Sequence, residues 1–394
     1  MNQRGRWVFL FVFGILVFYT GIQAHRLMPE ASQAKIWMGV IVFFWGMLGG
    51  QYLYRLQSLS KSPRWISSLV WSGMFFFGAW GTFMMASLLI EGAFLLRALM
   101  MGGWFEPSRN IFIAALIFSF VLALLGLRES ILGPLVRDVP VPVTGLPLGI
   151  QGFRIVQISD LHVGPTIGEK YVERVVDQVL DLKPDLIAMT GDLADGNPEA
   201  LKEKIRPLSR LKAPLSVFYV TGNHEYYWGA EAWVKKMREM GIVPLIDENK
   251  IVTHNGCQIL VGGICDSSAP FFVATHKSDV ALAGKSPGVF DFKILLAHRP
   301  NSCVEAEKAG FDLQLSGHTH GGQFFPLSLL IGFFHRYSRG LNRCGKMWVY
   351  VNSGTGYWGP PNRLGVASEI TLLRLVESEF KKKKKDKLEI EGLG

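Results

Sequence analysis

The sequence predicts a bundle of four transmembrane helices followed by an α/β domain of two packed mixed β-sheets flanked by helices. Three observations lead to this prediction. Of the 394 residues 49% are hydrophobic, and apolar residues dominate the chain before about Pro140. Beyond Pro140, strand and helix patterns alternate, which is typical of an α/β domain with parallel strands at its centre. After about Val243 short strand patterns predominate, which predicts a second sheet packed on the first.

Four segments of the first region, residues 1–138, carry no charge and are long enough to cross a bilayer. A spanning helix needs about 20 mostly apolar residues. One such segment could be a buried core helix, and the first could be a signal peptide. Four in succession, with no small-residue cleavage site after the first, favour membrane spans. The segments are 7–24, 36–54, 65–90 and 110–127.

Lysine and arginine in the connecting loops predict the orientation of these spans. If the N-terminus is cytoplasmic, seven basic residues lie on the cytoplasmic side and four on the other. Four spans then return the chain to the cytoplasm. We therefore expect a multi-pass protein of the cell inner membrane with a cytoplasmic second domain. The seven are Arg4, Arg6, Arg55, Lys61, Arg64, Arg128 and Arg137, and the four are Arg26, Lys35, Arg97 and Arg109.

Cysteine and lysine usage narrows the class of protein further. The cysteines form no Cys-x-x-Cys pair, as expected of structural thiols in a reducing compartment. Residues 377–394 form a polybasic tail that contains five consecutive lysines, 381–385, and contributes to the net charge of +9. We expect this tail to be solvated, with attraction to anionic lipid as the alternative. No aromatic residues alternate with the lysines, which disfavours nucleic acid as a partner. The cysteines are Cys257, Cys265, Cys303 and Cys344.

The second region begins with a proline-rich stretch, residues 139–151, which we predict to be an extended linker because proline disfavours helix. Residues 152–376 form the predicted α/β domain. Its first half has strands predicted at 153–159, 185–190 and 216–220, and helices at 168–182, 198–211 and 231–240. Its second half has strands predicted at 251–254, 258–261, 293–297, 313–316, 347–352 and 369–375.

Polar side chains follow five of these predicted strands at their carboxyl ends, where open α/β sheets bind ligands. Each motif alone is a weak signal, because short matches arise by chance and a lone histidine is usually a core or surface residue. Flanking glycines let the backbone turn sharply, so that the side chains can approach a shared centre. The residues are Asp160, His162, Asp192, Asn223, His224, His298, His318 and His320.

This set of side chains predicts a metal centre. Carboxylate, imidazole and amide oxygen suit a divalent first-row ion such as Mn, Fe or Zn, and the lack of thiolate in the set disfavours a structural zinc site. Eight ligands and helpers are too many for one ion and about the right number for two. Mn is the ion we expect first.

In order and spacing, the motifs Asp-x-His, Gly-Asp, Gly-Asn-His-Glu, His and Gly-His-x-His resemble the calcineurin-like metallophosphoesterase superfamily. The longer string Gly-His-Thr-His-Gly-Gly-Gln, with Ser-Gly-Thr-Gly and Pro-x-Arg further on, resembles a membrane-tethered bacterial subfamily that includes UDP-diacylglucosamine hydrolases. The resemblance runs from about Phe153 to Leu375. It implies an αββα sandwich, two divalent metal ions and hydrolysis of a phosphate ester or pyrophosphate.

The resemblance also implies a role for each matching residue. One ion would be held by Asp160, His162, Asp192 and His320, and the other by Asp192, Asn223, His298 and His318. Asp192 would bridge the ions, and a hydroxide shared by both would attack phosphorus. His224 would donate a proton to the leaving oxygen or stabilise the transition state, unless it only supports Asn223. Arg363 is either a phosphate-binding residue or a surface charge.

Two uncharged apolar stretches, 271–273 and 323–334, bear on the substrate. Each is either a core strand with a turn or a hydrophobic lip that reaches the membrane. The lip would suit a lipid or lipid-linked phosphate, such as a phospholipid or a lipid A precursor. The alternatives are a soluble phosphodiester such as a cyclic nucleotide, a non-catalytic sensor, and a transporter. A transporter is disfavoured because the predicted spans carry no charge.

Overall fold

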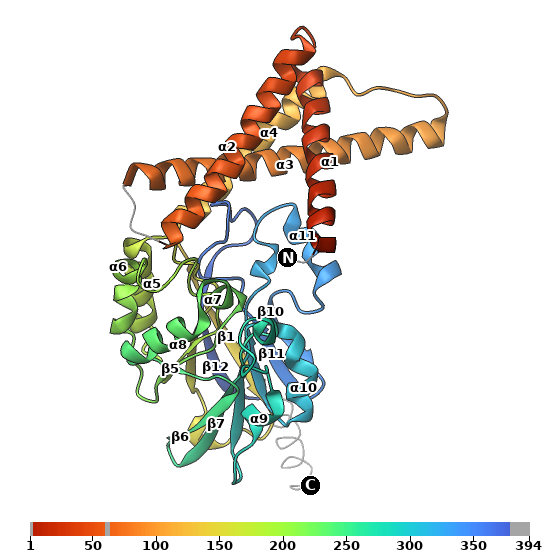
Figure 1. The fold of residues 1–394 in the computed structure, drawn as a ribbon. Helices are drawn as coiled ribbons and strands as arrows, with labels where there is room; N and C mark the ends of the chain where they lie inside the picture. Colours follow the sequence, from red (N-terminus) through yellow and green to blue (C-terminus); the bar gives the residue numbers. More distant parts are fainter. Residues whose placement is uncertain (1–2, 60–63, 379–394) are drawn as a thin grey trace, which may run out of the picture.

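Four long helices form one end of the molecule, and a two-sheet α/β domain forms the other (Figure 1). The computed structural model describes residues 3–59 and 64–378, so the lysine run of the predicted tail lies outside the described residues. In Figure 1, α3 runs across the other three helices. The helices are α1 (Gln3–Leu27), α2 (Gln33–Leu59), α3 (Arg64–Met101) and α4 (Arg109–Leu132), and together they are called the helical region.

All four segments predicted to span the membrane are helical, but the described residues support two spans rather than four. Both α3, over Trp65–Met101, and α4 are long and apolar enough to cross a bilayer. The described apolar stretch of α1, Phe11–Leu27, is shorter than the about 20 residues that a span requires. The end of α2 packs against the α/β domain, where Ser58 is fully buried and Tyr54 contacts Asp195. The prediction of a four-span bundle is therefore corrected to two candidate spans.

The longest helix also contains charge that the sequence prediction excluded from the spans. The helix α3 continues past residue 90 and includes Glu91. Glu91 pairs with Arg26 of α1 and accepts a hydrogen bond of 2.9 Å from Gln23 of the same helix. This charge is neutralised within the helical region, where it ties α3 to α1.

The first sheet has the strand order β1-β12-β2-β3-β4-β5. Its parallel strands β2 to β4 lie where the sequence predicts them. Residues 139–143 of the predicted extended linker belong to β1, which pairs in parallel with β12. Pro140 and Pro142 fit there because an edge strand leaves backbone N–H groups unpaired. The strands are β1 (Leu135–Val143), β2 (Arg154–Ile158), β3 (Leu186–Met189), β4 (Val217–Tyr219), β5 (Val243–Pro244) and β12 (Glu369–Glu377).

The second sheet has the order β10-β11-β9-β8-β7-β6, with β7, β8, β9 and β11 parallel. The sequence predicts five of its six strands and misses β10. The strands are β6 (Glu248–His254), β7 (Cys257–Gly263), β8 (Phe292–Leu296), β9 (Leu313–Ser316), β10 (Gly340–Cys344) and β11 (Met347–Val351).

The two sheets pack face to face, and helices cover their outer faces, which confirms the predicted α/β arrangement of two mixed sheets. Buried side chains such as Ile155, Phe218 and Ile294 fill the layer between the sheets. Val175 of α5 and Trp233 of α8 pack on the outer face of the first sheet. The predicted helix at 198–211 is only the short α6, followed by a 3-10 helix that contains Pro207. The helices are α5 (Glu169–Asp181), α6 (Lys202–Ile205), α7 (Asn223–Trp228), α8 (Ala230–Glu239), α9 (Val280–Gly284), α10 (Cys303–Lys308) and α11 (Leu327–Phe334).

Candidate metal centre

The residues that the sequence singles out lie on loops after β2, β3, β4, β8 and β9, where the carboxyl ends of both sheets meet. Five of them have a positive φ, although none is glycine. A positive φ is costly for such residues, and strained backbone of this kind concentrates at functional sites. The five are Asp160 (51°), His162 (50°), Asp192 (50°), His318 (71°) and His320 (50°).

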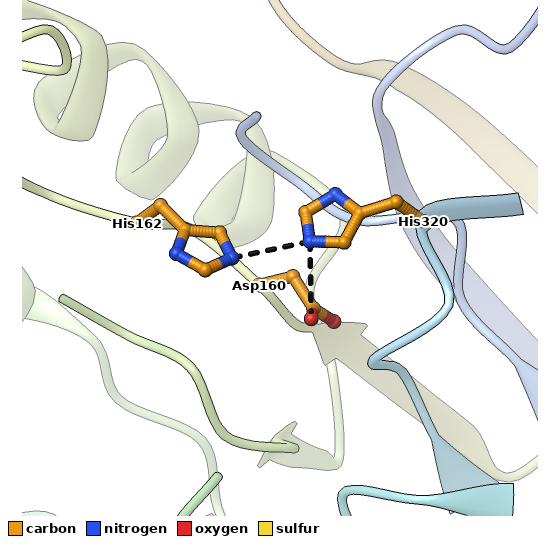
Figure 2. A group of neighbouring side chains, drawn as sticks. All are labelled: Asp160, His162 and His320. Carbon is orange, nitrogen blue, oxygen red and sulfur yellow. Dashed lines mark hydrogen bonds and ion pairs between the residues drawn. The ribbon is translucent and has the colours of Figure 1, made fainter. Parts of the chain in front are cut away.

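A first cluster joins the loops after β2 and β9. Figure 2 shows the side chains of Asp160, His162 and His320 pointing toward one another. The Nε2 atoms of His162 and His320 are 3.1 Å apart, and His320 Nε2 lies 3.4 Å from Asp160 Oδ1. All three side chains are buried. One carboxylate and two imidazoles therefore converge from two different sheets.

A second cluster joins the loops after β3, β8 and β9. It consists of Asp192, His298 and His318. His298 Nε2 lies 3.2 Å from Asp192 Oδ2 and 3.2 Å from His318 Nδ1. The backbone N–H of His318 donates to both oxygens of Asp160, at 3.0 Å each. This bond places the second cluster directly beside the first.

A third group contains a carboxylate that the sequence reasoning missed. Asp195 Oδ1 contacts Nδ1 of His224, and its Oδ2 lies 3.3 Å from Nδ1 of His162. The other ring nitrogen of His224, Nε2, lies 3.9 Å from Asp192 Oδ2. The available signal was a second aspartate three residues after Asp192, in the same loop.

Asn223, a predicted ligand of the second ion, is the first residue of α7. Its side chain is 6% exposed, and its Oδ1 accepts a hydrogen bond of 3.4 Å from Arg299. Two residues further along α7, the side chain of Glu225 accepts hydrogen bonds from the backbone N–H groups of Gly222 (2.6 Å) and Asp192 (3.0 Å). Glu225 therefore holds the loops after β3 and β4 together, a role that the sequence did not reveal.

Burial and charge set opposite protonation states within the centre. Burial, together with the nearby His298 charge, lowers the pKa of His318 to about 3. Burial likewise lowers the pKa of His320 to about 4, in spite of Asp160. Neutral imidazoles of this kind are the form that binds metal ions.

His298 and His224 titrate in the other direction. Burial alone would lower the pKa of His298, but the carboxylate of Asp192 raises it to about 10. For His224 the opposing charges are Asp192 and Asp195, which outweigh burial and raise the pKa to about 9. These carboxylates therefore attract positive charge into the site, whether it is a proton or a cation.

Of the two alternatives that the sequence suggested for Arg363, the surface charge is wrong. Arg363 is fully buried, so it is not a surface charge, and burial lowers the pKa of its guanidinium to about 10. The guanidinium donates to the carbonyls of Gly356 (Nε, 2.9 Å) and Ser353 (Nη1, 2.7 Å). Its Nη2 lies 3.1 Å from Nδ1 of His320. Arg363 thus supports the backbone and ring of a cluster residue from behind.

Exposed aromatic and aliphatic side chains surround the centre. Of the two alternatives for the stretch 323–334, the core strand is wrong, because residues 327–334 form the helix α11, none of whose residues is buried, with Phe333 84% and Phe334 80% exposed. In Figure 1, α11 lies on the side of the α/β domain that faces the helical region. In the other apolar stretch Phe272 is also exposed, and its ring lies 5.7 Å from that of Tyr227, which in turn is 5.3 Å from His224.

The two clusters fit divalent cations by their chemistry and spacing. Metal–nitrogen bonds of about 2.0–2.1 Å place neighbouring ligand atoms of one ion roughly 3 Å apart. The ring nitrogens of His162 and His320, and those of His298 and His318, have this separation. A shared cation would account for the close approach of the two imidazoles in each cluster.

Comparisons with known proteins find similarity over both regions. A family model described as calcineurin-like phosphoesterase matches residues 153–322. A transmembrane protein with metallophosphoesterase domain from Danio rerio is 33% identical over 368 residues, which cover 90% of this chain and 83% of that protein. An uncharacterized metallophosphoesterase from Helicobacter pylori is 34% identical, over 69% of this chain and 74% of that protein.

Among solved structures, the calcineurin-like phosphoesterase YfkN from Bacillus subtilis aligns with a TM-score of 0.36 and 15% identity, over 52% of this chain and 82% of that one. Because the α/β domain is little more than half of the sequence, the match to the Danio rerio protein extends into the helical region.

Proposed function

The chain belongs to the calcineurin-like metallophosphoesterases, and from that premise we propose that it is a dinuclear hydrolase of lipid or lipid-linked phosphate esters or pyrophosphates. That it is a phosphoesterase, and that its fold implies divalent metal ions, follows from the family. The two-ion chemistry and the lipid substrate are the proposed steps. The observation that carries the chemistry is the pair of adjoining clusters of carboxylates and imidazoles.

We assign one ion to Asp160, His162, Asp192 and His320, and the other to Asp192, Asn223, His298 and His318. The separate clusters around Asp160 and Asp192 support two sites, and Asp192 is the shared ligand in this assignment. Mn suits this mixture of carboxylate and imidazole, with Fe or Zn as the alternatives. Bound ions would activate water and neutralise charge on the phosphoryl oxygens.

The other residues of the site would either donate a proton or hold the ligand loops in place. His224 presents Nε2 toward the centre while Asp195 holds Nδ1, so the ring is oriented to donate a proton to a leaving oxygen. Asp192 and Asp195 beside His224 outweigh burial and raise its pKa to about 9. Glu225 and Arg363 keep the ligand loops in place through their backbone contacts.

The exposed apolar side chains of α11 and of Phe272, together called the apolar rim, support a lipid substrate. A helix as apolar as α11 with no buried residue is costly in water, whereas it is stable at a bilayer surface. At the base of α11, Phe325 and Pro326 line an apolar cavity of about 630 Å³ together with residues of α3 and α4. A path of apolar surface therefore connects the rim to the two candidate spans. A phospholipid or a lipid A precursor has the phosphate and acyl chains that fit it.

We also propose that the α/β domain faces the cytoplasm of a cell with the chain in its inner membrane. With the two candidate spans α3 and α4, Arg97 and Arg109 lie toward the connection between these helices. Most of the other Lys and Arg counted above lie on the side of the α/β domain, and this excess supports the orientation. The start of α1 lies beside the α/β domain in Figure 1, so both are on the same side of the helical region.

The experiment is to purify the full chain in detergent with Mn²⁺ and offer it phospholipids, a lipid-linked pyrophosphate, a cyclic nucleotide and bis(4-nitrophenyl) phosphate. We expect turnover to be highest on a lipid substrate and to fall by more than about 10³-fold in Asp192→Asn, since this residue would serve both ions. Equal turnover by the wild type and Asp192→Asn would contradict the two-ion chemistry. Preference for the cyclic nucleotide over every lipid would contradict the lipid substrate alone.

A further inference from the structure

The loop after β3 receives a side chain from the helical region. The hydroxyl of Tyr54, near the end of α2, donates a hydrogen bond of 2.7 Å to Asp195 Oδ2. Asp195 is 2% exposed, and its carboxylate also faces the rings of His162 and His224. One buried carboxylate of the site is thus bound both by two histidines of the α/β domain and by a hydroxyl from α2.

A second contact holds the end of α2 on the same loop. The backbone N–H of Asn197 donates to the carbonyl of Ser58 at 3.0 Å, and Ser58 is fully buried. A Cβ atom added to Gly196 would lie 2.6 Å from that carbonyl, so only glycine permits the approach. Since Tyr54 and Ser58 are four residues apart, both lie on the same face of α2. The position of Tyr54 is therefore fixed by contacts one turn further along.

We propose that Tyr54 is a positioning residue of the active site, which fixes the Asp195 carboxylate and through it the ring of His224. The inference rests on the proposed role of His224 in proton donation. With Oδ2 held by Tyr54, Oδ1 stays in contact with Nδ1 of His224. Nε2 then keeps facing the metal centre. Without the hydroxyl, Oδ2 keeps only its contact of 3.3 Å with Nδ1 of His162, so the carboxylate and the ring of His224 are held less firmly.

A contact on the opposite side of the site shows the same dependence on the helical region. The carbonyl of Gly126 in α4 accepts a hydrogen bond of 3.0 Å from the backbone N–H of Arg363. The side chain of Asn362 lies against Gly126 so closely that a Cβ atom there would clash with it. Helices α2 and α4 thus support the two loops that carry Asp195 and Arg363. The geometry of the site depends on where these helices lie.

The test is Tyr54→Phe in the full chain with Mn²⁺, assayed on bis(4-nitrophenyl) phosphate and on diphenyl phosphate. The phenolate of diphenyl phosphate is the poorer leaving group, so its departure depends more on a donated proton. We expect kcat on diphenyl phosphate to fall about tenfold, a part of the ~10²–10⁴-fold that a positioned acid contributes, and kcat on the nitrophenyl ester to change less. KM and the number of bound metal ions should stay as in the wild type.

The matched control is Tyr52→Phe, because Tyr52 lies on the same helix and is 64% exposed; it should behave as the wild type. In an Asp195→Asn background, Tyr54→Phe should have no further effect, because the two residues act as one unit. Equal losses on both esters, wild-type activity of Tyr54→Phe, or independent effects in the double variant would each overturn the inference. A wild type that hydrolyses neither ester in a metal-dependent way would instead contradict the proposed function.

Discussion

The two regions of the molecule contribute to the site in different ways. The α/β domain provides the carboxylates and imidazoles, each from a short loop that directly follows a strand. The helical region provides no residue of the two clusters among its described residues, but it supports the loops of Asp195 and Arg363. The chemistry therefore belongs to one region, while the rigidity of the site depends on both.

The difference shows how a metallophosphoesterase fold can be joined to apolar helices while all residues of the two clusters come from the α/β domain. The hydroxyl of Tyr54 and the backbone carbonyls of Ser58 and Gly126 join the helices to the loops that carry Asp195 and Arg363. Variants of the two regions should consequently differ in what they change. Those at the clusters should alter metal binding and turnover, and those at the contacts should alter geometry and substrate dependence.

Removal of metal from the clusters of the α/β domain should have the largest effect on turnover. Dialysis against a chelator is expected to abolish turnover, since water activation and charge neutralisation both require the ions. It should also lower the melting temperature of the α/β domain, because the carboxylates and histidines of the clusters are left to face one another. Turnover measured before and after Mn²⁺ is added back, with calorimetry, tests both effects. Activity that survives exhaustive chelation would break the assignment of chemistry to the clusters.

Substitution of His224, the proposed proton donor, should have the next largest effect. For His224→Asn we expect kcat to fall by about 10²–10⁴-fold, because a positioned acid is lost while the ligand residues stay in place. Elemental analysis should find the same metal content as in the wild type. A variant that instead loses one ion would show that His224 acts as a ligand, and the roles within the α/β domain would have to be reassigned.

Substitution of the buried Arg363 tests whether this residue supports the backbone or takes part in phosphate binding. Arg363→Lys keeps the charge but loses the planar set of donors that bind the carbonyls of Gly356 and Ser353. The free energy of unfolding should fall by about 1–3 kcal/mol, the cost of leaving buried acceptors without partners. Denaturant titration measures this loss, and Arg343→Lys on an exposed strand position serves as the control. Unchanged stability together with a raised KM would return Arg363 to the role of a phosphate-binding residue.

Substitutions in the apolar rim should have the smallest effect on activity, and this effect should be limited to substrate in a membrane. Replacing Phe333 and Phe334 with serine removes exposed rings that contact no core, so the fold should be unaffected. We expect KM for substrate in phospholipid vesicles to rise several-fold, since the two rings would no longer insert at the bilayer surface. KM for bis(4-nitrophenyl) phosphate should not change. Equal changes in KM for both substrates would contradict the proposal that α11 binds the membrane.

Much of the α/β domain could be predicted from the sequence, because its signals are local. Apolar runs such as 153–159 mark strands, and glycines beside Asp192 and His318 mark the turns that follow. The edge strand β1 was missed because its prolines indicate a linker unless its partner β12, more than 200 residues later, is known. Asp195 was overlooked because a second carboxylate in a loop is common and carries no distinctive spacing.

The contacts of the helical region could not be predicted in the same way. Nothing around Tyr54 or Gly126 distinguishes these residues from their neighbours on the helices, and their partners lie over 100 residues away in the chain. The apolar stretch that became α11 was ambiguous because a short apolar run suits a core strand and an exposed helix equally. Burial of Arg363 was likewise hidden, since arginine is rarely found without exposure.

The central claim is that two cations share the space between the clusters of Asp160 and Asp192. The most direct measurement is an anomalous difference map from crystals of the full chain grown with Mn²⁺. We expect two peaks about 3.5–4 Å apart, one beside His162 and His320 and the other beside His298 and His318. A single peak, or peaks away from these histidines, would contradict this claim.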